Sequence, residues 1–349
     1  MGKVYYYNAI KNILSIKSNV KDFKFSYGLS MPEVEKSEYD NALIKIDVDI
    51  VKENLAPTED EKKDMGKFHY FSGKPGSNKM FYERNFFFKK KLQYIISDID
   101  TNHVKIKANK NYFRYVTHRF MNIHSVGYIL TDIANLRFLH NGLAPLHCSG
   151  ISRNGESHII FAPPNTGKTL TSMTLCMEDD TYAYVAEDLA LTDAKYAYSV
   201  PWTSTFRYYD SIDSGWWSRT LNKLTEKVSI LELFSFGKVE KVTKYVASIE
   251  DKSKIKGLFI LDRGPEEVKD VTADDAFNRI NTLDRYEFNY MRAPAIIAYE
   301  YFNPQTDIEA AYANERTLLK DMIANAEFIK VISTAYALNY AGVIREIIE

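Results

Sequence analysis

Residues 159–169 have the sequence IIFAPPNTGKT and carry the strongest structural signal in the chain. The apolar run at its start predicts a strand, the Pro- and Gly-containing segment predicts a tight loop, and Lys168 begins a predicted helix. A strand, a loop and a helix N-terminus in this order bind phosphate, because loop amides and the helix dipole both point at the anion. The stretch matches the GxxxxGK[ST] pattern with Ala162 in place of the first glycine.

We expect this loop and the first turn of the following helix to bind a nucleotide through Asn165, Thr166, Gly167, Lys168, Thr169 and Leu170. Lys168 is expected to neutralise the outer phosphates, and the Thr169 hydroxyl to hold Mg²⁺. Pro163 and Pro164 lack an N–H, but they precede the five amides of residues 165–169 that face phosphate in such loops. The predicted cofactors are therefore ATP and Mg²⁺.

Three further residues are candidates for the chemistry. An apolar run over residues 182–186 leads into Glu187 and Asp188, and the carboxyl ends of strands are where open α/β sheets gather ligand groups. We expect one of these carboxylates to bind Mg²⁺ and the other to accept a proton from an attacking hydroxyl. His147 lies on the predicted strand before the loop, although a lone histidine on a strand more often has a structural role.

The composition limits the class of protein. The chain has 349 residues, a formal net charge of −1, 45% hydrophobic and 26% charged residues, as in ordinary globular proteins. The near-zero charge argues against a general nucleic-acid binder, and the basic run at residues 89–91 is interpreted as a solvated loop or helix face. Cys148 and Cys176 predict free thiols in a reducing compartment. With no signal peptide and no bilayer-spanning run, we expect a cytoplasmic protein without a membrane partner.

Periodicity divides the chain into two parts. Residues 1–122 carry short alternating runs between turn-rich stretches and predict a β-rich N-terminal domain, whereas residues 123–349 predict an α/β nucleotide-binding domain. In the second part we expect helices over 126–140, 168–177, 308–326 and 337–348, and strands over 143–151, 158–161, 181–186, 256–262 and 328–333. Residues 153–156, Arg-Asn-Gly-Glu, predict a hairpin turn.

Aromatic residues are unusually abundant, with 25 Tyr, 20 Phe and 3 Trp making up 14% of the chain. They concentrate in the N-terminal part and over residues 196–217, just beyond the acidic pair. We expect Trp216 and Trp217 to be buried or interface anchors, and Trp202 to line an acceptor pocket. The remaining histidines show no metal-ligand spacing, which predicts no zinc site.

The chain resembles the HPr kinase/phosphorylase family in the order of its segments. They are Leu146-His147-Cys148-Ser149, a strand, the predicted phosphate-binding loop, a helix, a strand and the acidic pair. That family shares its nucleotide-binding fold with phosphoenolpyruvate carboxykinase. The resemblance is closest over residues 122–191 and weaker through residues 199–203 and 257–264. It implies an α/β fold with a phosphoenolpyruvate carboxykinase-like P-loop core, here preceded by a β-rich N-terminal domain.

The resemblance also implies roles for individual residues. Lys168 and Thr169 match the family's loop lysine and its Mg²⁺-binding hydroxyl residue, and Asp188 matches the proton acceptor in phosphotransfer. Glu187 takes the place of the family's first acid, and His147 matches its active-site histidine. The family's downstream motif for the reverse reaction has no convincing match, so we expect a kinase without phosphorylase activity.

Two functions remain open. The first is an ATP-dependent kinase in which Asp188 orients and deprotonates a hydroxyl acceptor, either a serine of a protein or peptide or a small-molecule alcohol. Arg207 or Arg263 is a candidate for a further positive charge. The second is a nucleotide-binding regulatory or scaffold module without phosphotransfer activity. Acceptor specificity, docking and homo-oligomer contacts are open alternatives for the N-terminal part.

Overall fold

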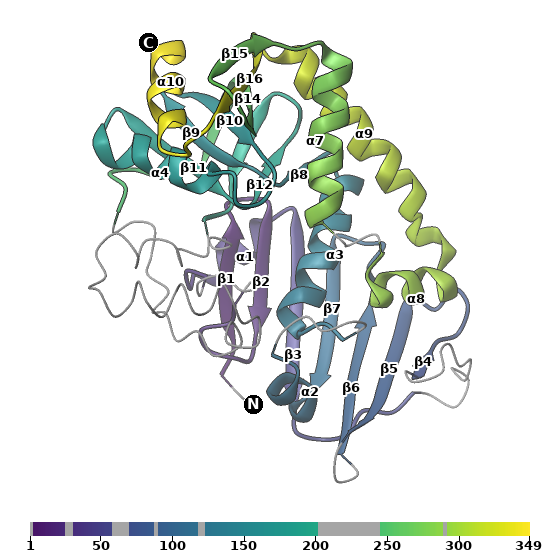
Figure 1. The fold of residues 1–349 in the computed structure, drawn as a ribbon. Coiled ribbons are helices and arrows are strands. Elements are labelled where there is room, and N and C mark those ends of the chain that lie inside the picture. Colours follow the sequence, from purple (N-terminus) through teal and green to yellow (C-terminus); the bar gives the residue numbers. More distant parts are fainter. Residues whose placement is uncertain are drawn as a thin grey trace.

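The computed structural model describes residues 3–24, 31–57, 70–86, 90–117, 123–201, 245–288 and 292–349. Within these ranges the protein is a mixed α/β structure with two mixed β-sheets, of seven and nine strands, and eight α-helices (Figure 1). The predicted α/β class is confirmed at this level. Trp202, Arg207, Trp216 and Trp217 lie outside the described residues, so the expectations about them stay predictions.

The seven-stranded sheet, called the N-terminal sheet, has the order β1-β2-β3-β7-β6-β5-β4. Its strands are β1 (Tyr5–Ile10), β2 (Leu14–Ser18), β3 (Ile44–Val51), β4 (Tyr70–Ser72), β5 (Lys79–Phe86), β6 (Lys90–Ser97) and β7 (His103–Asn109). β2, β3 and β7 are parallel neighbours, and the other pairs are antiparallel. The α-helices among the described residues of this part are the short α1 (Lys36–Asn41) and α2 (Lys110–Tyr115).

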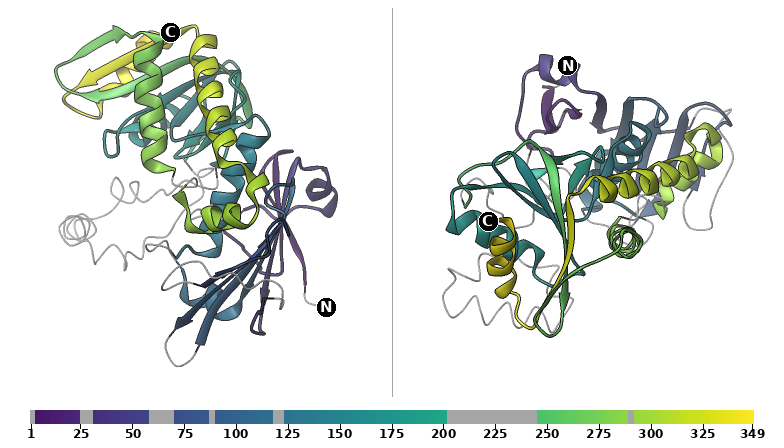
Figure 2. Two further views of the ribbon diagram at one scale, coloured as in Figure 1. Left: turned by 90° about the vertical axis from the view of Figure 1, so that its right-hand side faces the viewer. Right: turned by 90° about the horizontal axis from the view of Figure 1, so that it is seen from above.

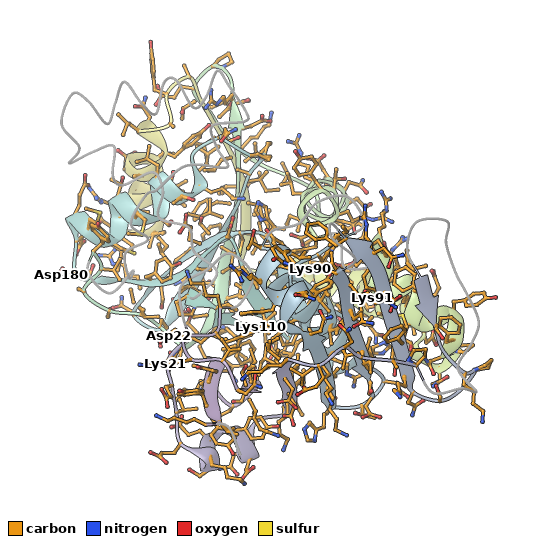
Figure 3. The ribbon with its side chains drawn as sticks, turned by 90° about the horizontal axis from the view of Figure 1, so that it is seen from below. Lys21, Asp22, Lys90, Lys91, Lys110 and Asp180 are labelled. Carbon is orange, nitrogen blue, oxygen red and sulfur yellow. The ribbon has the colours of Figure 1, made fainter. Side chains whose placement is uncertain are left out.

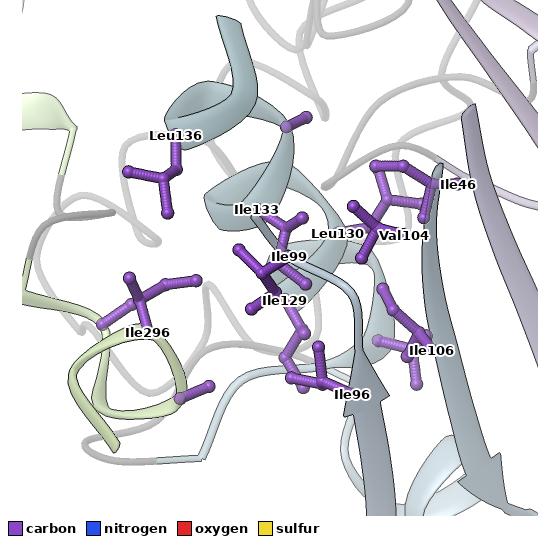
Figure 4. Packing of buried hydrophobic residues seen from close by; sticks show 14 of the residues in the cluster. Ile46, Ile96, Ile99, Val104, Ile106, Ile129, Leu130, Ile133, Leu136 and Ile296 are labelled. Atoms are coloured by element: carbon purple, nitrogen blue, oxygen red, sulfur yellow. The ribbon is translucent and has the colours of Figure 1, made fainter. Parts of the chain in front are cut away.

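One face of the N-terminal sheet is covered by helices from later in the chain, α3 (Val126–His140) and α8 (Pro294–Phe302). Figure 4 shows the contact, in which aliphatic residues of the sheet strands pack against α3 and α8. The labelled side chains are Ile46, Ile96, Ile99, Val104, Ile106, Ile129, Leu130, Ile133, Leu136 and Ile296. One hydrophobic core therefore includes residues from both sides of the predicted boundary at 122, and the division into two domains stays a prediction.

Aromatic side chains fill another part of the same core. Tyr82 and Tyr94 stack with ring centroids 4.6 Å apart, and Tyr112 meets both rings edge-on. All three belong to the buried core. Offset-stacked and edge-to-face rings pack favourably beyond the area that they bury. The aromatic excess of the N-terminal part is thus used, at least in these residues, for packing.

The nine-stranded sheet, called the C-terminal sheet, has the order β11-β9-β10-β14-β13-β12-β8, with β16 beside β14 and β15 beside β16. Its strands are β8 (Ala144–Leu146), β9 (Ser149–Arg153), β10 (Glu156–Phe161), β11 (Tyr182–Glu187), β12 (Ala190–Thr192), β13 (Tyr196–Ser199), β14 (Lys252–Arg263), β15 (Glu267–Asp270) and β16 (Phe328–Thr334). β10, β14 and β16 are parallel neighbours.

Helices cover both faces of the C-terminal sheet (Figures 1 and 2). Helices α4 (Lys168–Glu178) and α10 (Asn339–Ile348) lie on one face, and α7 (Ala273–Glu287) and α9 (Ile308–Asn325) lie on the other. Along β10, Ile160 packs on the α4 side, whereas Ile159 and Phe161 pack on the α7 side. Burial on both faces explains why this strand is a continuous apolar run rather than an alternating one.

The prediction of one strand over residues 143–151 is wrong. The chain forms two strands, β8 and β9, with His147 and Cys148 between them. β8 pairs with β12, whereas β9 pairs with β10 and β11, so the chain moves to another part of the sheet at this break. The physical reason is that the backbone N–H of His147 donates to the Asp284 carboxylate at 2.7 Å instead of joining a strand ladder.

Several local predictions are confirmed. The turn between β9 and β10 has positive φ at Asn154 (56°) and Gly155 (77°), as a two-residue hairpin requires. Both cysteines are free and buried. The interpretation of the basic run as a loop or helix face is wrong for its described residues, because Lys90 and Lys91 begin strand β6. Lys90 donates to the Tyr115 hydroxyl at 2.5 Å, Figure 3 labels both lysines, and Lys89 lies outside the described residues.

A polar cluster fixes α1 to the N-terminal sheet. The buried Asp47 carboxylate of β3 accepts hydrogen bonds from Tyr39 of α1 and Lys17 of β2, both at 2.5 Å. His103 Nε2 of β7 lies 3.3 Å from the same carboxylate. Desolvation alone would raise the pKa of Asp47, but the hydrogen bonds from Lys17 and Tyr39 outweigh it and the pKa is lowered.

The substitution Asp47→Asn is expected to lower the free energy of unfolding by about 2 kcal/mol near pH 7, because a charged acceptor of two hydrogen bonds is lost. The folded-state pKa of Asp47 lies below its ordinary value of 3.8, so the stabilisation is present above that value and is lost as the pH falls through the folded-state pKa. Urea unfolding across this pH range measures the difference. Asp49→Asn, an exposed position on the same strand, is the matched control, and equal losses in both variants would contradict the prediction.

Candidate functional site

Three segments meet at one edge of the C-terminal sheet. β10 and β11 end at this edge, and β9, which lies between them, begins there, because Ser149 pairs with Ile160 on one side and Glu187 on the other. The residues just beyond these strand ends are therefore neighbours in space. They are His147 before β9, the loop of residues 162–167 after β10, and Asp188 after β11.

The predicted phosphate-binding loop, residues 162–167, has a backbone that is compatible with its residues. Gly167 caps α4 with φ 126°, and a Cβ at this position would lie 2.9 Å from the Cβ of Ala337, so only glycine fits. Ala162 is fully buried and is not among the described non-glycine residues with positive φ, so alanine is compatible with this position. The Arg263 guanidinium donates to the carbonyl of Asn165 at 2.6 Å and ties the loop to β14.

The expected nucleotide-binding residues lie around the N-terminus of α4. Lys168 is the first residue of the helix, and Thr169 and Leu170 follow in its first turn, both half-buried. Thr166 is buried and Asn165 is exposed. A helix begins with N–H groups that have no intrahelical partner, and these groups together with the helix dipole attract an anion.

Lys168, His147 and Asp188 come together in the structure. The Lys168 ammonium donates to His147 Nε2 at 2.5 Å, and both residues are buried. On the other side of the ring, His147 Nδ1 lies 3.8 Å from the Asp188 carboxylate. Because Nε2 accepts a hydrogen bond from the ammonium, we assign the ring proton to Nδ1, which faces Asp188.

The charges in this group set the protonation of the histidine. Burial and the neighbouring Lys168 ammonium lower the pKa of His147 to about 3, and only the backbone of Asp188 acts in the opposite direction. His147 is therefore neutral at physiological pH. It acts as an acceptor for Lys168 rather than as a cation or a strong base.

Asp188 combines solvent access with a raised pKa. Its backbone has φ 81°, a conformation that aspartate tolerates better than most residues, and 47% of its side chain is exposed. Desolvation by the surrounding protein raises the pKa of Asp188, and the Lys168 charge only partly offsets this. Glu187, the last residue of β11, is buried, at 4% exposure.

Sequence reasoning missed Asp284, which positions the site from the opposite side. This residue of α7 accepts the backbone N–H of His147 at 2.7 Å and is 1% exposed. Burial raises the pKa of Asp284 well above its ordinary range, and the negative charge of the buried Glu315 on α9 raises it further. The Lys168 charge acts in the opposite direction.

A weak signal for Asp284 is present in the sequence. Within α7, Ala276, Ile280 and Asp284 are four residues apart and share one face, and all three are buried. A carboxylate on the apolar stripe of an amphipathic helix indicates a buried acid with a specific partner. The partner itself, a backbone N–H far away in the sequence, leaves no such signal.

The predicted donors for Mg²⁺ are all oxygen atoms, which is the ligand chemistry that Mg²⁺ prefers. They are the Thr169 hydroxyl at the start of α4 and the carboxylates of Glu187 and Asp188 at the end of β11. Among the described residues, no three His, Cys, Asp or Glu side chains are grouped to hold a metal ion. Mg²⁺ is usually held by one or two protein carboxylates together with substrate phosphates and water, so the donor set fits that mode.

No protein-family model matches this chain, and no curated protein matches it either. Across the parts of the chain that the structure describes, no helix is long and apolar enough to cross a membrane.

The substitution Asp284→Asn tests the buried acid, because asparagine keeps an acceptor for the His147 N–H but cannot ionise. The folded-state pKa is raised above 3.8, so the wild type loses stability as the pH rises from that value toward the folded-state pKa. The variant lacks this loss. We expect the variant to gain stability relative to wild type with rising pH. The free energy of unfolding of the variant minus that of wild type should be larger at about pH 8 than at about pH 5.

Chemical denaturation at the two pH values measures this change, and any constant cost of the new amide cancels in the comparison. Asp275→Asn, an exposed position in the first turn of the same helix, is the control. A relative stability of Asp284→Asn that stays constant or falls between the two pH values would show that the acid is not held with a raised pKa.

Proposed function

We propose that the protein is an ATP-dependent kinase that transfers the γ-phosphoryl group to a hydroxyl acceptor. The observation that carries the proposal is the convergence of Lys168, His147 and Asp188 at the N-terminus of α4. A buried cation beside an anion-binding helix terminus suits the outer phosphates, and a partly exposed carboxylate next to it suits an incoming hydroxyl.

The individual groups have distinct tasks in this proposal. The amides of residues 165–169 and the Lys168 ammonium bind the phosphates and stabilise the charge that develops during transfer. Asp188 orients the acceptor hydroxyl and takes its proton, and a raised pKa makes it a better proton acceptor near neutral pH. With Asp188 as the proton acceptor, Thr169 and Glu187 would hold Mg²⁺, which would further neutralise the phosphate charge.

His147 has a positioning task. As a neutral ring it holds the Lys168 ammonium on one side and faces Asp188 on the other. It thereby sets the distance between the group that binds phosphate and the group that binds the acceptor. This order of residues is also what resembles the HPr kinase/phosphorylase family, and the phosphoenolpyruvate carboxykinase-like core is part of the proposal.

A nucleotide-binding regulatory or scaffold module without phosphotransfer is the second candidate function. It is favoured by the burial of Glu187, which stands where the resembling family has its first aspartate. A carboxylate that is 4% exposed is less accessible to a metal ion than one at the surface. Both candidates share the nucleotide site and differ in whether transfer occurs.

Two substitutions separate binding from transfer. Lys168→Ala is expected to weaken MgATP binding, because the cation that faces the phosphates is lost. Asp188→Asn is expected to leave MgATP binding close to wild type and to lower phosphoryl transfer by roughly 10²–10⁴-fold, the usual contribution of general acid–base catalysis. Thermal-shift titration with MgATP measures binding, and radiolabel transfer to pooled peptides and metabolites measures the reaction.

The outcomes distinguish the candidates. Absence of stabilisation of the wild type by MgATP would overturn both the kinase and the module. Binding without any labelled acceptor across broad pools of peptides and alcohols would favour the module. Transfer that persists in Asp188→Asn would remove Asp188 from the proposed role of proton acceptor.

The pH dependence of transfer provides a separate test. Transfer requires ionised Asp188, so the rate is expected to fall as the pH falls through the pKa of Asp188, which lies above its ordinary value of 3.8. His147, with a pKa of about 3, does not titrate in this range. The acid limb should therefore persist in His147→Gln, whose amide oxygen still accepts from Lys168. Loss of the limb in that variant would assign it to the histidine.

A further inference from the structure

The turn between β16 and α10 carries the two most exposed large hydrophobic side chains in the described part of the chain. Tyr336 is 72% exposed and Leu338 is 70% exposed, with the half-buried Ala337 between them. The turn is held by its own hydrogen bonds, because the Thr334 hydroxyl (2.7 Å) and the Asn339 N–H (3.1 Å) both donate to the carbonyl of Tyr336. The turn therefore offers two exposed apolar side chains to a ligand that binds beside it.

This turn contacts the phosphate-binding loop. Ala337 lies so close to Gly167 that a Cβ on the glycine would be 2.9 Å from the alanine Cβ. Arg263, the last residue of β14, pairs in register with Thr334, the last residue of β16, and donates to the carbonyl of Asn165 in the loop.

The topology explains this arrangement. β10, β14 and β16 are three adjacent parallel strands, so the segments that follow them emerge at the same edge of the C-terminal sheet. In α/β sheets this edge is where ligands bind. The loop of residues 162–167 and the turn of residues 335–338 therefore lie side by side at this edge, and α4 and α10 lie on the same face of the sheet (Figure 1).

We infer that Tyr336 and Leu338 hold the base of the nucleotide whose phosphates occupy the loop, an inference that rests on the proposed function. A nucleotide anchored at the N-terminus of α4 needs an apolar surface for its base beside the loop, and this turn provides one. Every nucleobase has a π-face that stacks on an aromatic ring. Leu338, the other exposed apolar residue of the turn, would add an aliphatic contact to the base.

The test compares two ligands that share phosphates and differ in the base. Calorimetric titration of the full-length chain with MgATP and with magnesium tripolyphosphate gives the affinity for each. Tyr336→Ala is expected to weaken MgATP binding by about tenfold or more and to leave tripolyphosphate binding unchanged, since base–aromatic stacking contributes on this scale. Tyr336→Phe, which keeps the ring, should bind MgATP like the wild type.

Tyr301→Ala is the matched control, because Tyr301 is also an exposed tyrosine (59%) but lies on α8. Wild-type affinity of Tyr336→Ala for MgATP would overturn the inference, because the ring would then make no contact with the base. Equal losses for both ligands would also overturn it, because the turn would then only support the loop. If the wild type binds neither ligand, the proposed function itself fails.

Discussion

The hydrogen bond from the His147 backbone to the buried Asp284 carboxylate is the interaction on which the candidate site depends. It replaces a ladder hydrogen bond where β8 ends, so that the chain leaves one part of the sheet and re-enters it as β9. This re-entry places His147 between the strand ends that lead to Lys168 and to Asp188. A continuous strand through residues 143–151 would instead keep its side chains alternating across the two covered faces of the sheet.

A buried ammonium group organises the charges around this hydrogen bond. A lone buried cation is costly. The Lys168 ammonium lies close enough to Asp188 and Asp284 for its charge to lower the pKa of both carboxyl groups. Burial lowers the pKa of His147, and the same ammonium lowers it further because a second cation beside it is unfavourable, so the histidine is neutral. The protonation states of the four groups therefore depend on one another, and the charge that we propose for phosphate binding is part of the folded structure.

The helices α3, α8 and α9 join the site to the rest of the molecule. Residues at the start of α9, Ile308 and Ala311, pack in the core of the N-terminal sheet together with α3 and α8, whereas Leu319, Met322 and Ile323 pack under the C-terminal sheet. One helix thus contributes to both cores. Because close-packed interiors resist deformation, this shared helix holds the two sheets in a defined relation to each other. Helix α7 packs beside α9, so the residue Asp284 that it contributes to the site is held in place as well.

Local chemistry determined what could be predicted from the sequence alone. Four features follow from patterns within a few residues. They are the strand, loop and helix around Lys168, the hairpin at Asn154-Gly155, the helix over residues 126–140 and the acid at Asp188. The tertiary structure alone decided the break at His147, the role of Asp284 and the position of Ala337 beside Gly167. The His147–Asp284 hydrogen bond joins residues 137 positions apart, and no periodicity along the chain records a contact that exists only when a helix packs on a sheet.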